Sequence, residues 1–183
     1  MSKVIGFQTG IGFQRADQPA ADDQPLHYMA CGLDNIYLLN GFKREIIDGE
    51  EYVTIEDLGG LWKAIGLHLV TTRKVLAPKE IRFLRQHMDM TQAELGARLR
   101  VSDQTVARWE KDQCEKDGPA DLMLRVLFLG SPLAQPEGND MLRDLIKLLD
   151  ELQERDEAKE KADVFEHEDK QWQDSERELE LRK

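Results

Sequence analysis

The sequence predicts a mainly α-helical fold with a small N-terminal α+β part, and three patterns support this prediction. Residues 91–109 carry hydrophobic side chains where two short helices, joined by a tight turn, would face each other. Residues 43–55 show the alternation and the Asp-Gly turn of a β-hairpin. Residues 142–152 repeat leucine and isoleucine at intervals of three and four, as on one face of an amphipathic helix. With 183 residues, 40% of them hydrophobic, the chain can form one ordinary domain or two small ones.

The first 26 residues are expected to form a flexible arm. The triplet Gly-Phe-Gln occurs at 6–8 and again at 12–14, and the sequence then becomes polar and contains proline. A short strand pair at the repeat is the alternative, although so short a repeat often arises by chance. We assign no function to this segment.

Residues 27–77 are predicted to form a small domain made of a β-hairpin and a helix. The hairpin turn is Asp48-Gly49, a pair of residues that favours the tight two-residue turn between strands. Strands are expected over 35–39, 43–47 and 51–55. A helix should follow them, because hydrophobic side chains recur at helical spacing at Leu58, Leu61, Trp62, Ile65 and Leu69.

The helix pair within residues 91–109 begins with a capping box. Thr91 can accept a hydrogen bond from the backbone three residues on, while Glu94 can reach back to the Thr91 amide. Ser102 is placed to cap the second helix in the same way. Four hydrophobic side chains would pack between the helices: Leu95, Leu99, Val106 and Trp109. Gly96 beside them allows close approach of a neighbouring segment.

The opposite face of the second helix is polar and predicts contact with DNA. It presents Ser102, Asp103, Gln104, Thr105 and Arg108. Glutamine can pair with adenine edges in the major groove, arginine with guanine, and serine or threonine with either base. A solvated helix of an unrelated protein would look similar, but the agreement of caps, turn and spacing favours the DNA-binding interpretation.

The same stretch is similar to the helix-turn-helix of the phage repressor and Cro class, also called the XRE family. The similarity extends to an upstream helix at 78–88 and a downstream helix at 119–129, and it implies a repressor-like helix-turn-helix bundle. It further implies that Gln92 contacts phosphate or the base-contacting side chain, and that Glu110 and Lys111 close the recognition helix. The residues implied to face DNA are Ser102, Asp103, Gln104, Thr105 and Arg108.

Two residues depart from the family pattern. Arg100 stands where these motifs usually carry glycine in a left-handed turn, which costs on the order of 1 kcal/mol for another residue. Arg100 could also contact a phosphate. Asp103 brings a negative charge near the groove, which weakens nonspecific binding, although it could accept from a cytosine amino group.

Charge is unevenly distributed along the chain. The net charge is −11, but residues 136–183 alone hold 17 acidic and 9 basic side chains. Residues 73–111 hold nine Lys and Arg against five Asp and Glu. Because salt limits the reach of a charge to about 8 to 10 Å, this local positive excess is what attracts phosphate.

The segment before the helix pair resembles that of bacterial and phage-borne regulators with a Tyr-x-x-Cys-Gly-Leu-x-Asn element, which here runs from Tyr28 to Asn35. Some relatives of that architecture carry a zinc ribbon and act as antitoxins. Their metal site needs paired Cys-x-x-Cys motifs, whereas this chain has only Cys31 and Cys114. We therefore expect no zinc, no disulfide framework and no other cofactor.

Other candidate chemistry is weaker. His27 and Cys31 are four residues apart, but two ligands make no tetrahedral metal site, and Cys31 is expected to be a small buried residue. His68 is expected to be structural, because no nucleophile or carboxylate stands beside it in a recognisable arrangement. The sequence therefore argues against an enzyme.

The C-terminal third is predicted to hold a linker, an amphipathic helix and an acidic tail. Prolines and a glycine interrupt helicity over 131–140, and the apolar stripe then resumes. Either the body of the same subunit or the same helix of a second subunit would cover that stripe, and we expect a homodimer. Beyond residue 161, Phe165 and Trp172 could form a small docking strand, but a solvated, partly disordered tail is the expected state.

The predicted organisation follows from these elements. It comprises an arm (1–26), a β-hairpin-plus-helix domain (27–77), a helix-turn-helix domain (78–130), a linker with a dimerisation helix (131–161) and an acidic tail (162–183). No stretch approaches the roughly 20 apolar residues of a membrane span, and the amino terminus lacks a secretory signal, so a cytoplasmic location is expected.

These observations predict a sequence-specific transcriptional regulator that binds double-stranded DNA. A repressor that occupies a palindromic operator as a homodimer is the favoured hypothesis. The alternative is the antitoxin of a toxin–antitoxin pair, which would bind a protein partner and autoregulate its promoter.

Overall fold

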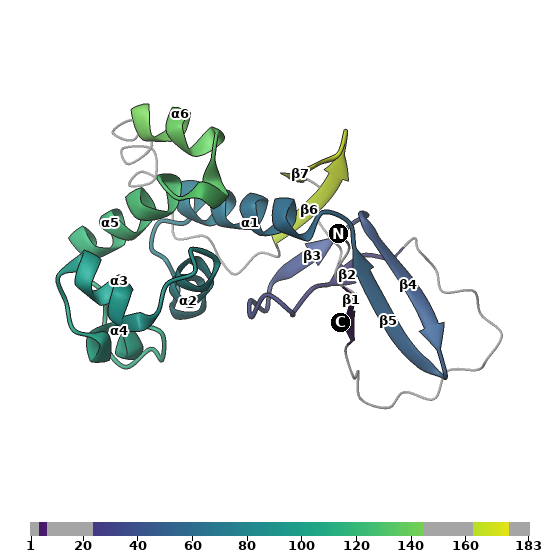
Figure 1. Cartoon of the computed structure of the whole chain (residues 1–183), viewed down its shortest axis with the longest axis horizontal. Helices are drawn as coiled ribbons and strands as arrows, with labels where there is room; N and C mark the ends of the chain where they lie inside the picture. The colour runs from purple at the N-terminus through teal and green to yellow at the C-terminus, as the bar shows by residue number, and fades with distance from the viewer. Residues whose placement is uncertain (1–3, 7–23, 145–162, 176–183) are drawn as a thin grey trace. The chain divides into compact units, whose positions relative to one another are not determined.

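A computed structural model describes residues 4–6, 24–144 and 163–175, in which the chain forms two compact units (Figure 1). The first, the sheet unit, takes in residues 1–29, 34–61 and 162–183. The second, the helical unit, takes in residues 30–33 and 62–161. The described strands belong to the first unit. The first helix begins at the end of that unit, at residue 58, and continues into the second unit, which holds the later described helices.

One sheet of the sheet unit has the strand order β1-β5-β4. Strands β4 (Phe42–Ile47) and β5 (Glu50–Ile55) form an antiparallel hairpin in which Phe42 lies opposite Ile55 and Ile47 opposite Glu50. Asp48 and Gly49 both have positive φ angles, 54° and 84°, as a type I′ turn requires. The predicted hairpin is thus confirmed.

Strand β1 (Val4–Gly6) corrects the prediction of a flexible arm at that point. It pairs antiparallel with β5, with Val4 opposite Thr54 and Gly6 opposite Tyr52. β-Branched residues favour strands, and the hairpin leaves one side of β5 open to a further strand. Residues 7–23, the rest of the predicted arm before Gln24, lie outside the described residues.

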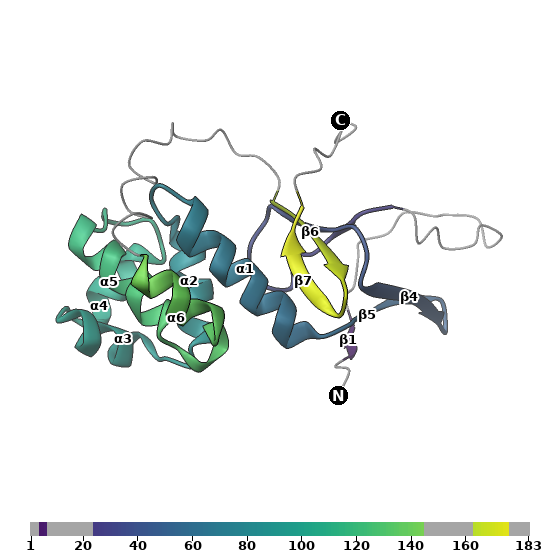
Figure 2. The same ribbon diagram turned by 90° about the horizontal axis from the view of Figure 1, so that it is seen from above.

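The second sheet corrects the prediction of a solvated tail. Its strand order is β2-β3-β6-β7, formed by β2 (Leu26–His27), β3 (Ile36–Leu38), β6 (Asp163–Glu168) and β7 (Gln171–Asp174). Figure 2 shows the β6–β7 hairpin in yellow. Strand β6 pairs in parallel with β3, although the two are far apart in sequence.

Burial explains why this tail segment is ordered. Phe165 is fully buried and Trp172 is 7% exposed. The Asn35 side chain donates to the Asp163 carboxylate at 2.9 Å, and the Trp172 indole donates to the Glu56 carbonyl at 3.0 Å. These contacts outweigh the charge of the surrounding sequence. Residues 176–183 lie outside the described residues.

The helices follow the predicted order. They are α1 (Leu58–Thr72), α2 (Pro78–His87), α3 (Gln92–Leu99), α4 (Asp103–Trp109), α5 (Gly118–Leu129), the short 3-10 helix η1 (Pro132–Ala134) and α6 (Glu137–Arg143). The sequence predicted α2 and α5 to within a residue at each end.

In the helical unit, Ile65, Leu69 and Phe128 are fully buried. A side chain at Gly66 would collide with the Phe128 ring, so glycine allows α1 and α5 to pack closely there.

Helix α6 begins inside the segment that was expected to interrupt helicity. Lys63 forms an ion pair with Glu137 and donates to the Gln135 carbonyl at 2.8 Å. Gly138 lies against the Leu129 carbonyl, where a larger side chain would collide. These contacts start the helix directly after Pro136. Residues 145–162, which hold most of the predicted apolar stripe, lie outside the described residues.

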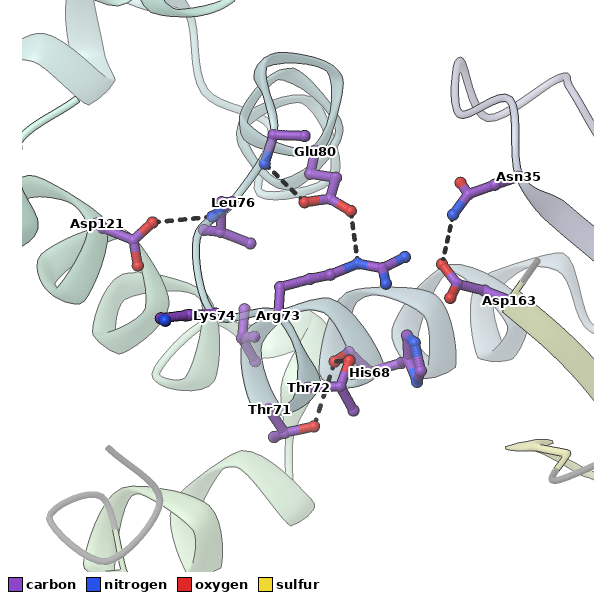
Figure 3. Close-up of polar contacts among 12 residues, drawn as sticks. Asn35, His68, Thr71, Thr72, Arg73, Lys74, Leu76, Glu80, Asp121 and Asp163 are labelled. Carbon is purple, nitrogen blue, oxygen red and sulfur yellow. Dashed lines mark hydrogen bonds and ion pairs between the residues drawn. The ribbon is translucent and has the colours of Figure 1, made fainter. Parts of the chain in front are cut away.

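Charged side chains hold the connection between α1 and α2, where Figure 3 shows Glu80 beside Arg73 and Asp121 beside the Leu76 amide. Arg125, only 1% exposed, donates to the carbonyls of Val70 and Lys74 at 2.7 and 3.3 Å and forms an ion pair with Asp121. Asp121 also accepts from the Leu76 amide at 3.1 Å. Burial raises the pKa of Asp121, but hydrogen bonds from Lys116 and Arg125 lower it by a larger amount. The pKa of this carboxyl group therefore lies below its ordinary value.

Candidate nucleic-acid interface

Helix α3 starts with the predicted capping box. The Glu94 amide donates to the Thr91 hydroxyl at 3.1 Å, and the Thr91 amide donates to the Glu94 carboxylate at 2.7 Å. Hydrogen bonds from the amide and hydroxyl of Thr91 lower the pKa of Glu94. Two backbone donors at the helix start are therefore satisfied locally.

The turn between α3 and α4 has the left-handed residue that the sequence predicted. Arg100 adopts φ 58° and ψ 36°. The Val101 amide donates to the Gly96 carbonyl at 2.9 Å, and a Cβ atom at Gly96 would lie 2.8 Å from the Val101 carbonyl oxygen. Glycine at 96 therefore lets the backbone turn directly against α3 and enter α4.

Helix α4 is capped by Ser102 and packed on its inner face. The Thr105 amide donates to the Ser102 hydroxyl at 3.1 Å, and the two hydroxyls are 2.9 Å apart. Val106 is fully buried and Trp109 is 5% exposed, as predicted for the face toward α3. The sequence thus predicted both the start and the packed face of this helix.

The outer face of α4 presents the side chains that the sequence singled out. Ser102, Asp103, Gln104 and Arg108 are exposed, Thr105 is half-buried, and Lys111 just beyond the helix is exposed. Ser102 and Thr105 hydrogen-bond each other, and the Asp103 carboxylate accepts from the Gln104 amide at 2.8 Å. Gln104 and Arg108 have the longest side chains on this face, and their amide and guanidinium groups offer the most hydrogen-bond donors.

An ion pair that the sequence analysis did not predict holds α4 in place. Glu110 accepts from Arg85 of α2 at 2.5 and 3.1 Å, and their side chains are only 5% and 11% exposed. Gln92, at the start of α3, donates to the same carboxylate at 2.8 Å. A negative charge at a helix C-terminus is unfavourable without a partner. The position of Glu110 at the end of α4 was therefore the one sequence feature that pointed to a cationic partner. Gln92 is half-buried in this network and Arg100 is exposed.

Positive charge remains at the surface around the helix pair. Arg73 forms an ion pair with Glu80, and Arg85 forms one with Glu110. Each pair uses one positive and one negative charge, so the local excess of positive charge is unchanged. The remaining arginines of this region are exposed, namely Arg82, Arg98, Arg100 and Arg108. The local excess of positive charge is therefore carried by side chains that solvent can reach.

The His, Cys, Asp and Glu side chains of the described residues form no metal-binding cluster. Cys31 is buried, as expected, and the exposed His27 ring is 2.6 Å from the Asp34 carbonyl and stacks on Tyr37. No helix in the described part is long and apolar enough to cross a membrane.

Comparison with known families agrees with this geometry. Residues 81–118 match a family model described as helix-turn-helix, and the match supports an XRE-type regulator. It spans most of α2, all of α3 and α4, and the loop up to the start of α5. No curated protein and no solved structure matches the chain. The fold of this segment and its family match support a DNA-binding transcriptional regulator.

Proposed function

We propose that this protein is a sequence-specific transcriptional repressor that occupies a palindromic operator as a homodimer. The observation that carries the proposal is the exposed polar face of α4, a helix that begins at the Ser102 cap and whose orientation the Arg85–Glu110 ion pair fixes. A helix that reads the major groove needs hydrogen-bonding side chains on the face toward the bases and firm packing on the opposite face.

The side chains of this face divide into two roles. Arg108 and Gln104 are long enough to reach base edges, where arginine pairs with guanine and glutamine with adenine. Thr105 and Ser102 make shorter contacts to bases or to phosphate, and Asp103 accepts from a cytosine amino group. Gln92, Arg100 and Lys111 at the margins bind the phosphate backbone and set the position of α4 in the groove.

The Gln92 network supports this division. Its amide nitrogen has two hydrogens, and the carboxylate of Glu110 accepts from that nitrogen. The second hydrogen can donate to a phosphate oxygen without breaking the bond to Glu110. The orientation of Gln92 is therefore set before DNA binds, which reduces the entropy lost on binding.

Selection of bound duplexes from a random DNA pool, using the purified full chain, tests the proposal. An enriched consensus with two inverted half-sites about 10 base pairs apart is expected of a dimer with one recognition helix per subunit. A single half-site would retain DNA recognition and reject the palindrome. No enrichment at any salt concentration would reject sequence-specific binding by this chain alone.

That last outcome would favour the antitoxin hypothesis, in which a protein partner is needed for tight DNA binding. A small adjacent reading frame whose product binds this chain and restores enrichment would establish that alternative. Enrichment by the isolated chain, without such a partner, supports the repressor.

A further inference from the structure

Strand β4 lies at an edge of its sheet. The described strands of that sheet follow the order β1-β5-β4, so one side of β4 has no neighbouring strand among the described residues. An open edge presents unpaired backbone donors and acceptors to any strand that can align with it. Ile46 is 67% exposed and Ile47 is 50% exposed, which places two adjacent aliphatic side chains on opposite faces of this edge strand.

The hydrogen bonds of the hairpin show which backbone groups point outward. The Glu56 amide donates to the Gly41 carbonyl at 2.8 Å, and the two residues continue the register of β4 and β5. In an antiparallel pair, hydrogen-bonded positions alternate with non-bonded positions. The odd-numbered residues of β4 therefore bond to β5, and the backbone groups of Phe42, Arg44 and Ile46 point away from it.

The edge sequence is complementary to itself. We propose that β4 pairs antiparallel with β4 of a second copy, about a two-fold axis at Arg44. This register aligns Phe42 with Ile46 of the second copy and Lys43 with its Glu45. All three outward-facing residues then exchange hydrogen bonds, and each face of the new sheet gains two equivalent contacts.

The like charges at the axis are already compensated within each copy. Arg44 lies 3.6 Å from the Glu51 carboxylate, and its guanidinium carbon is 5.2 Å from the centre of the Phe42 ring. Its side chain is only 16% exposed. The Arg44 guanidinium also donates to the Gln24 carbonyl at 3.4 Å, so in each copy it is held against its own chain and away from the two-fold axis.

Shifting the axis by one residue loses this complementarity. An axis at Glu45 would bring two glutamates together and would place Lys43 opposite Ile47. In that register the backbone groups of Arg44 would pair with those of Ile46 of the second copy, but Phe42 would lie opposite Asp48, which is beyond the end of the strand. The register at Arg44 is therefore favoured by hydrogen bonds, charge and apolar contact together.

A second copy fits this edge better than an unrelated strand, because the self-complementary order of apolar, basic and acidic side chains specifies its own partner. The proposed interface lies wholly on the sheet unit. It requires no DNA, so its failure would leave the proposed recognition by α4 untouched.

Charge reversal on the full chain tests the interface. The dimer dissociation constant is measured by sedimentation equilibrium without DNA. It is expected to rise about tenfold in Lys43→Glu and in Glu45→Lys, because each change turns both symmetric cross-strand charge pairs from attractive to repulsive. The double variant Lys43→Glu/Glu45→Lys restores the pairs and should return to the wild-type constant. Glu50→Lys on β5 makes the same reversal away from the edge and should leave the constant unchanged.

Mixing the two single variants gives a second, independent readout. A Lys43→Glu chain and a Glu45→Lys chain complement each other at both positions, so native mass spectrometry of an equimolar mixture should show more than twice as much heterodimer as either homodimer, which is the ratio that random pairing gives. Backbone amides of Phe42, Arg44 and Ile46 should also exchange with deuterium more slowly as wild-type concentration rises. A monomer at all concentrations, a dimer unaffected by the reversals, or a double variant as weak as the singles would each overturn the proposal.

Discussion

Arg100 is the residue at which backbone strain and a proposed DNA contact coincide. Its φ of 58° lies in the left-handed region, which costs a residue other than glycine on the order of 1 kcal/mol, and its side chain is exposed. No hydrogen bond from this side chain to another described residue offsets that cost. A phosphate contact would explain why arginine is present at this position.

Arg100→Gly is therefore expected to act in opposite directions on stability and on DNA binding. The free energy of unfolding should rise by about 0.5 to 1 kcal/mol in urea titrations, because glycine adopts this conformation without strain. Affinity for DNA should fall on all sequences alike. Arg98→Gly, inside α3, is the matched control and should lower stability by about 1 kcal/mol. Unchanged affinity in Arg100→Gly would contradict the phosphate contact.

His87 makes the stability of the helical unit depend on pH. Burial between Trp62 and Phe83 lowers the pKa of this half-buried ring below its ordinary value near 6.5, against the opposing effect of its hydrogen bond to the Phe83 carbonyl. The folded state therefore binds fewer protons than the unfolded state, and stability falls as pH drops below about 6.5.

The non-titrating variant His87→Phe isolates this contribution. Between pH 7.5 and pH 5.5 the wild type should lose more free energy of unfolding than the variant, whose other histidines are unchanged. Equal losses in the two proteins would show that His87 is not the group responsible.

At the scale of the elements, the position of α4 depends on a contact between three helices. The carboxylate of Glu110 binds Arg85 of α2 and Gln92 of α3, whereas the caps at Thr91 and Ser102 act only within their own helices. The caps fix where α3 and α4 begin. The ion pair fixes how α4 is presented to solvent.

Removing the acidic partner should be costly. Glu110→Ala leaves Arg85 charged and nearly buried, and loss of one partner of a buried ion pair lowers stability by about 3 to 5 kcal/mol. Chemical denaturation of the full chain measures this loss. Glu115→Ala, an exposed residue just beyond α4, should change stability by less than about 0.5 kcal/mol. A loss in Glu110→Ala no larger than in Glu115→Ala would contradict the assigned role.

The sequence predicted these helices well because their determinants are local. The capping box at Thr91, the cap at Ser102 and the Asp48-Gly49 turn each act over four residues or fewer. The Arg85–Glu110 pair joins positions 25 apart, and hydrophobic spacing contains no information on such partners. The exposed polar residues of α4 that form the candidate site could therefore be listed from sequence, but the network that orients them could not.

At the scale of the whole molecule, the C-terminal segment belongs to the N-terminal sheet. Strand β6 pairs with β3 at a separation of more than 120 residues, with Phe165 opposite Leu38. The acidic composition of the tail favoured a solvated state, and no local pattern specifies pairing with a strand so distant in sequence. Strand β1 was missed for the same reason.

Phe165→Ala tests this closure of the sheet. Because the ring is fully buried, its removal should lower the free energy of unfolding of the sheet unit by about 3 to 5 kcal/mol. Glu168→Ala on the exposed end of the same strand should have little effect. A Phe165→Ala variant as stable as wild type would show that the segment is a solvated tail.

The central claim, that the outer face of α4 recognises base sequence, is tested most directly by one binding comparison. Affinities of wild type and Gln104→Ala/Arg108→Ala are measured at one salt concentration for the selected duplex and for a scrambled duplex. Lys111→Ala serves as the control for loss of one positive charge near phosphate. Each lost base contact should cost the selected duplex about 1 to 3 kcal/mol, so the double variant should lose most of its preference between the two duplexes. Lys111→Ala should weaken both duplexes equally and keep the preference. An undiminished preference in the double variant, or an equal loss on both duplexes, would contradict the account.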